Sequence, residues 1–74
     1  MDTIVRIDGH VNVLRTVIRT INHLVKTQPG FYSVASVQRA INSQLEPKEY
    51  LTRHMIRRAI VRFAELTLDK QRAA

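Results

Sequence analysis

Three segments of this chain carry apolar residues at the spacing of an α-helix, and none of the three can bury its apolar side alone. The clearest segment covers residues 10–27, where one side of the helix is apolar and the other is polar. Packing three such stripes around a common core is the simplest way to bury them. The pattern therefore predicts a compact, mostly α, three-helix domain. The apolar stripe of residues 10–27 consists of Val13, Leu14, Val17, Ile18, Ile21, Leu24 and Val25, and Arg15, Thr16, Arg19, Asn22, His23 and Lys26 lie opposite.

The ends of the first two helices are predicted from capping and helix-breaking residues. Asp8 is a candidate N-cap for the first helix, and Pro29-Gly30 ends it. Ser33 is a candidate N-cap for the second helix, which we expect over residues 33–44.

The third helix is expected within residues 48–66, and its start has two alternatives. Proline is tolerated at the first position of a helix, so the helix could begin at Pro47. Alternatively, a turn precedes it and Thr52 is the cap. We expect residues 70–74 to be frayed, because they are polar and terminal.

Two short segments near the ends of the chain could form strands. Residues 3–7 are rich in β-branched side chains, and residues 66–69 are the only other candidate. A minimal β pairing of 3–7 with 66–69 would therefore accompany the three helices.

The length and composition limit the kinds of protein that this chain can be. A chain of 74 residues forms one domain. It has no cysteine, so it has no disulfide framework and no thiolate metal site. No apolar run is long enough to cross a membrane, and the charged start does not resemble a signal peptide. We therefore expect an intracellular, cytoplasmic protein with no membrane partner.

The charge is strongly basic and concentrated at one end. Twelve Lys and Arg against six Asp and Glu give a net charge of +6. Residues 51–74 hold six bases and two acids, so they carry +4 of that total. A basic excess of this kind indicates an acidic partner, most commonly nucleic acid.

One side of the third helix is predicted to be almost entirely cationic. No acid lies between Glu49 and Glu65 to pair with its bases, so the face repels itself unless an anion binds it. Arginine forms two-pronged hydrogen bonds with phosphate or guanine, and the major groove of DNA admits a helix. The alternatives are an acidic protein partner and a plain solvated face. The face consists of Arg53, His54, Arg57, Arg58, Val61 and Arg62.

Residues 33–41 and 51–66 resemble the helix-turn-helix pair of winged-helix DNA-binding domains. Thr52 opens the second element, and Ile56, Arg57, Arg58, Ala59 and Ile60 follow the rhythm of a recognition helix. The connection is longer than in the compact motif and lacks its glycine, and only residues 66–69 remain for a wing. The resemblance implies groove contacts by Arg53, His54, Arg57 and Arg58, and phosphate contacts by Ser33, Ser36, Arg39 and Lys48.

These observations predict a small DNA-binding protein, and the resemblance alone implies a role in transcriptional control. The alternative is an inhibitor or adaptor that binds an acidic protein surface with the same basic face. We expect no enzymatic activity, no cofactor and no metal, because the chain has no nucleophile motif, no phosphate-binding loop and no paired metal ligands. The broad apolar stripe of the first helix, with Val11 and Ile18 at its edge, would suit a homodimer.

Overall fold

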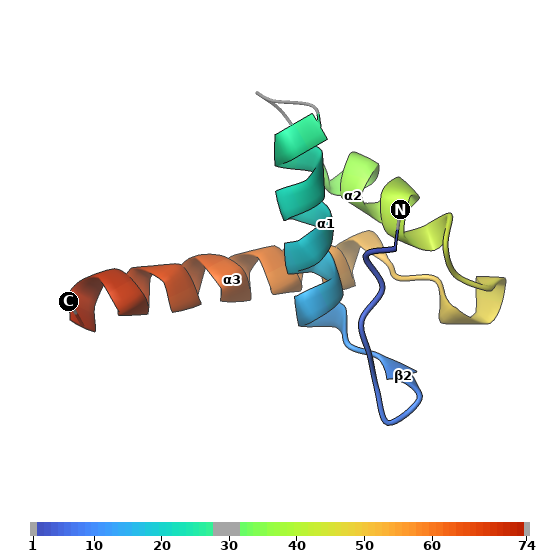
Figure 1. Cartoon of the computed structure of the whole chain (residues 1–74), viewed down its shortest axis with the longest axis horizontal. Helices are drawn as coiled ribbons and strands as arrows, with labels where there is room; N and C mark the ends of the chain where they lie inside the picture. Colours follow the sequence, from blue (N-terminus) through green and yellow to red (C-terminus); the bar gives the residue numbers. More distant parts are fainter. Residues whose placement is uncertain (1, 28–31, 74) are drawn as a thin grey trace.

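The computed structural model describes residues 2–27 and 32–73, and side chains up to residue 70. It is mostly helical, as expected, with a small antiparallel sheet near the N-terminus (Figure 1). No helix in these ranges is long and apolar enough to cross a membrane. The elements are β1 (Arg6–Ile7), β2 (His10–Val11), α1 (Val13–Thr27), α2 (Val34–Asn42), the short 3-10 helix η1 (Pro47–Glu49) and α3 (Arg53–Ala73).

The two strands form a hairpin, and the predicted pairing of residues 3–7 with 66–69 is wrong. β1 pairs with β2, with Arg6 opposite Val11 and Ile7 opposite His10. A two-residue turn brings these neighbours together at little loop-closure cost. Residues 66–69 are instead part of α3, where no glycine or proline interrupts the helix.

Asp8 belongs to the hairpin turn and is not the N-cap of α1, so that prediction is also wrong. Asp8 has a φ of 54° and Gly9 a φ of 80°. Positive φ at both central residues is what a tight two-residue hairpin needs, and Asp-Gly is a favoured pair for it. Asn12 takes the capping role, since its Oδ1 accepts a hydrogen bond of 2.9 Å from the backbone N–H of Arg15.

The cap predicted for α2 is confirmed. The Ser33 hydroxyl accepts a hydrogen bond from the Ser36 N–H at 3.1 Å, and the Ser36 hydroxyl accepts one from the Ser33 N–H at 2.8 Å. This reciprocal pair is a capping box. The helix ends at Asn42, two residues before the expected end. Pro29 and Gly30, the predicted stop of α1, lie outside the described residues.

The start of α3 combines both predicted alternatives. η1 begins at Pro47, and α3 begins separately after Thr52, whose hydroxyl accepts a hydrogen bond of 3.2 Å from the Met55 N–H. The helix then continues to Ala73. The predicted end at residue 66 is therefore wrong, because nothing in that stretch breaks a helix. The fraying of residues 70–74 stays a prediction.

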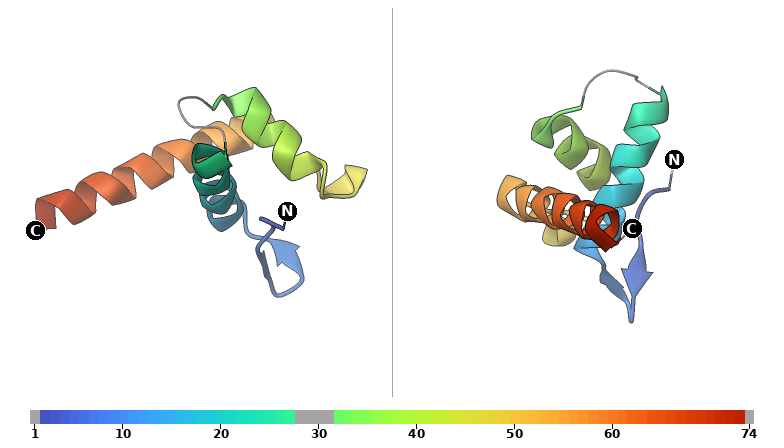
Figure 2. Two further views of the ribbon diagram at one scale, coloured as in Figure 1. Left: turned by 45° about the horizontal axis from the view of Figure 1, so that its top comes forward. Right: turned by 90° about the vertical axis from the view of Figure 1, so that its left-hand side faces the viewer.

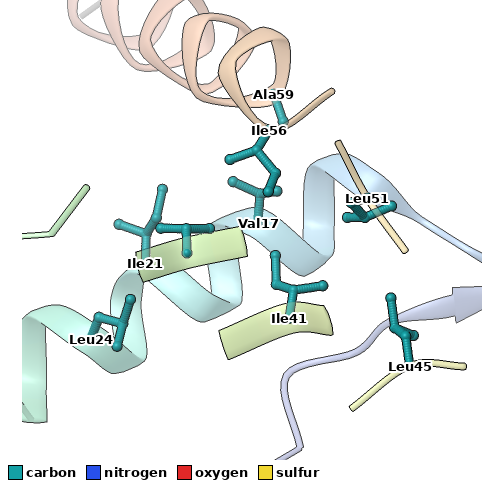
Figure 3. Close-up of a cluster of buried hydrophobic side chains, with 9 residues drawn as sticks. Val17, Ile21, Leu24, Ile41, Leu45, Leu51, Ile56 and Ala59 are labelled. Atoms are coloured by element: carbon teal, nitrogen blue, oxygen red, sulfur yellow. The ribbon is translucent and has the colours of Figure 1, made fainter. Parts of the chain in front are cut away.

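The core lies where α1 crosses α3 and α2 packs against both (Figure 3). Val17 from α1, Ile41 from α2 and Ile56 from α3 are all fully buried. Burying a side chain of this size contributes about 1.5–3 kcal/mol, so these three contacts fix the helices relative to one another. The remaining buried apolar residues are Ile21, Leu24, Val37, Leu45, Leu51 and Ala59.

Polar contacts hold the N-terminal segment against this core. The Thr20 hydroxyl is 2.9 Å from the Thr3 hydroxyl, and the Thr16 hydroxyl accepts a hydrogen bond of 3.0 Å from the Val5 N–H. Both Thr16 and Thr20 are fully buried. The prediction that Thr16 lies on the polar, outward side of the first helix is therefore wrong. The side chain of Gln44 adds a contact to the Thr3 hydroxyl, with its Nε2 donating at 3.0 Å.

An ion pair ties the hairpin to η1. Arg6 donates from its two terminal guanidinium nitrogens, Nη1 and Nη2, to the Glu49 carboxylate, at 2.6 and 3.2 Å. This hydrogen bonding raises the pKa of Arg6 and lowers the pKa of Glu49 below its ordinary value of 4.5. The pair is partly exposed, so its contribution to stability is modest.

Candidate nucleic-acid interface

The six residues of the predicted basic face all lie exposed on α3. Ile56 and Ala59 lie on the opposite side of α3 and are buried against α1 and α2. At 100° per residue, the six positions of the basic face fall on the side of the helix that points away from these two residues. Val61 is 56% exposed among these bases. The exposed set is Arg53, His54, Arg57, Arg58, Val61 and Arg62.

The start of α3 is held in place by polar side chains of α2. The carbonyl of Leu51 accepts hydrogen bonds of 3.1 Å from the side-chain amides of Gln38 and Asn42. The Leu51 N–H in turn donates to Asn42 Oδ1 at 2.9 Å. These bonds fix the chain just before the Thr52 cap, so they set the direction in which the basic face points. Gln38 and Asn42 could not be identified from the sequence, since amides on a helix surface carry no local signal of such a role.

Most of the basic residues border one shallow hollow on the surface of α3. The hollow has a volume of about 380 Å³, and its only acid is Glu65. The Glu65 carboxylate pairs with the Arg62 guanidinium at 3.4 Å, and both side chains are more than half exposed. An exposed pair of this kind is worth at most about 1 kcal/mol, so an incoming phosphate can replace it. The hollow is lined by His54, Arg57, Arg58, Val61, Arg62 and Glu65.

Arg53 does not border the hollow, and its side chain contacts α2. Its Nε donates a hydrogen bond of 3.3 Å to Gln38 Oε1. Arg39, exposed in the last turn of α2, follows Gln38 directly in the chain. Arg53 is thus the base that links the α3 face with α2.

The other three predicted phosphate contacts have different surroundings, and the Ser33 hydroxyl is engaged in the cap of α2, where it accepts from the Ser36 N–H. Lys48 is exposed in η1, and no hydrogen bond among the described residues joins it to α3. Figure 1 shows η1 at the end of the molecule away from the C-terminal half of α3. The Ser36 hydroxyl already accepts from the Ser33 N–H and lies 2.8 Å from the Ser33 carbonyl. A phosphate contact by Ser36 would compete with the cap of α2.

Across residues 2–27 and 32–73, no group of three or more His, Cys, Asp or Glu side chains is placed to hold a metal ion. Comparison of the chain with family models, with curated proteins and with solved structures found no match. The geometry and the charge of the α3 face are therefore the observations that bear on its function.

Proposed function

We propose that this chain is a DNA-binding protein that inserts α3 into the major groove. The observation that carries the proposal is the exposed cationic face over residues 53–62, which contains four arginines and no acid. A free helix face of this composition repels itself, and bound phosphate removes that repulsion. DNA is the polyanion whose shape best matches a single helix.

The dimensions of α3 fit a major groove. A helix with its side chains is about 10–12 Å across, and the groove is about 12 Å wide. Residues 53–62 extend over about 15 Å of helix axis. Arg57 and Arg58 are proposed to contact base edges and phosphates near the middle, with Arg53 and Arg62 on phosphates at either end. Val61 would meet a thymine methyl group, and a ring N–H of His54 would donate to phosphate.

The arrangement of α2 and α3 supports a role of the helix-turn-helix type. α2 holds the start of α3 through Gln38 and Asn42, as a support helix does for a recognition helix. Two features depart from a winged helix: the connection over residues 43–52 contains η1, and the hairpin precedes the helices. We therefore propose a variant of the motif in which the hairpin precedes the helices, with transcriptional regulation as its use.

The test is the salt dependence of binding to a random-sequence duplex, followed by fluorescence anisotropy. Four phosphate contacts give a slope of log K against log salt of about −3.6, so affinity falls about 150-fold between 50 and 200 mM salt. Arg57→Ala/Arg58→Ala removes two contacts. Its slope is expected near −1.8, a fall of only about 12-fold over the same range.

A matched control separates this face from the general charge of the chain. Arg19→Ala/Lys26→Ala removes the same charge from α1, where both residues are exposed and border a different hollow. This variant should keep a slope near −3.6. An equal loss of slope in both double variants would refute the assignment to α3, and absence of binding at low salt would refute DNA binding altogether.

The alternative partner is an acidic protein surface bound by the same arginines. Binding of that kind is also weakened by salt, so sequence preference is the measurement that distinguishes the two. A groove reader discriminates among duplexes by about 1–3 kcal/mol for each mismatched base pair. Equal affinity for every duplex in a selected pool would favour the protein partner.

A further inference from the structure

The C-terminal half of α3 extends beyond the three-helix core. Figure 2 shows this half of the helix running past α1, and the molecule reaches 41 Å in its longest direction against 21 Å in its shortest. Of the α3 residues, Ile56 and Ala59 are buried, whereas those from Ala64 to Lys70 are all exposed. A helical segment this short is marginal in water without tertiary contacts.

The extended half still carries the apolar stripe that begins in the core. Phe63 and Leu66 border a groove of about 470 Å³ together with Ile18, which comes from α1. Leu66 is 38% exposed although it continues the buried side of the helix. The lining of the groove is mostly apolar, but it also includes the charged residues Asp69 and Lys70. The groove is lined by Ile18, Phe63, Leu66, Thr67, Asp69 and Lys70.

The charge of this end differs from that of the rest of the chain. Residues 63–74 contain two acids and two bases, so their net charge is zero and the whole +6 lies on residues 1–62. A polyanion such as DNA gains nothing from a neutral apolar groove. A second copy of this basic chain meets no net charge repulsion from this segment.

The groove also has the charge pattern that pairing with itself requires. Asp69 and Lys70 are exposed, border the same groove and have opposite charges. In a two-fold interface each copy presents the same patch, so the acid of one copy can approach the base of the other. A patch with one charge of each sign is therefore complementary to itself.

We propose that two copies of this chain associate through this groove, with Leu66 at the centre of the interface. The extended halves of the two α3 helices pack against each other and cover Phe63 and Leu66. The groove is lined by six residues, so the interface it offers is small compared with a standard one of about 800 Å² per partner. The dissociation constant should therefore lie in the micromolar range.

Sedimentation equilibrium of the full chain, without nucleic acid and at fixed salt, tests the proposal. The wild type should change from monomer to dimer between about 5 and 500 µM. Leu66→Glu places a charge in the centre of the interface and should raise the dissociation constant at least about 100-fold. Circular dichroism at the same concentrations checks that the variant stays helical.

Leu68→Glu is the matched control. Leu68 is 52% exposed, does not border the groove, and lies about 200° around the helix from Leu66. It should leave the dissociation constant within about threefold of the wild type. A wild type that stays monomeric throughout, or an equal effect of both substitutions, would overturn the proposal. Neither result bears on DNA binding, which is measured separately by the salt slope of Arg57→Ala/Arg58→Ala.

Discussion

Thr20→Val tests whether the N-terminal segment is held to the core by buried hydroxyl contacts. Valine has nearly the shape of threonine, so the substitution removes a hydroxyl without opening a cavity. The Thr20 hydroxyl lies 2.9 Å from the Thr3 hydroxyl and 2.8 Å from the Thr16 carbonyl, and all three residues are buried. The substitution therefore leaves the hydroxyl of the buried Thr3 with one hydrogen-bond partner fewer.

The expected loss is about 1–2 kcal/mol in the free energy of unfolding, since a buried polar group loses a partner. In a domain of this size each kcal/mol lowers Tm by roughly 4–8 °C. Thermal unfolding and urea unfolding measure these two quantities, with the helix content followed by circular dichroism at about 222 nm.

Thr27→Val provides the control on the same helix. The Thr27 hydroxyl also donates to the carbonyl four residues earlier, that of His23, at 3.0 Å, but Thr27 is exposed. Its substitution should change stability by less than about 0.5 kcal/mol. Equal effects at both positions would show that only the bond within the helix matters, and the described anchoring of the N-terminal segment would be refuted.

Two further predictions concern the hairpin. The pKa of Glu49 is lowered by its hydrogen bonds from Arg6, so the ion pair stabilises the fold above the ordinary pKa of 4.5 and this contribution is lost as the pH falls through the lower, folded-state value. The difference in Tm between wild type and Glu49→Gln should therefore shrink from pH 7 to pH 3, and a constant difference would contradict the ion pair. Gly9→Ala meets no atom within 4 Å but must adopt a φ of 80°, so it should cost about 1 kcal/mol in urea unfolding; an unchanged midpoint would contradict the turn.

Helical periodicity predicted the three helices and much of the core. Val17, Ile21 and Leu24 all lie on the apolar stripe predicted for the first helix, and they are buried. The pair Ser33 and Ser36 illustrates a local signal that is sufficient on its own, because the capping box needs only residues three apart. The outward position of the bases on α3 followed from the same 100° step.

Contacts between distant residues could not be predicted in this way. Thr16 and Thr20 look polar to any periodicity measure, yet their partners Thr3 and Val5 lie 11 to 17 residues away. The hydroxyl groups are buried because those partners satisfy them, which no local pattern reveals. The support of Leu51 by Asn42 was missed for the same reason.

The unbroken course of α3 has a consequence for how the chain can change in length. The basic face and the α3 side of the apolar groove, which includes Phe63 and Leu66, share one helix, so their relative rotation is fixed by the number of residues between them. One residue inserted after Arg62 turns Phe63 and Leu66 by about 100° away from their present direction, whereas seven inserted residues turn them by only about 20° and move them about 10 Å. The separation of the two surfaces can thus vary only in steps of about two helical turns if both are to keep their directions.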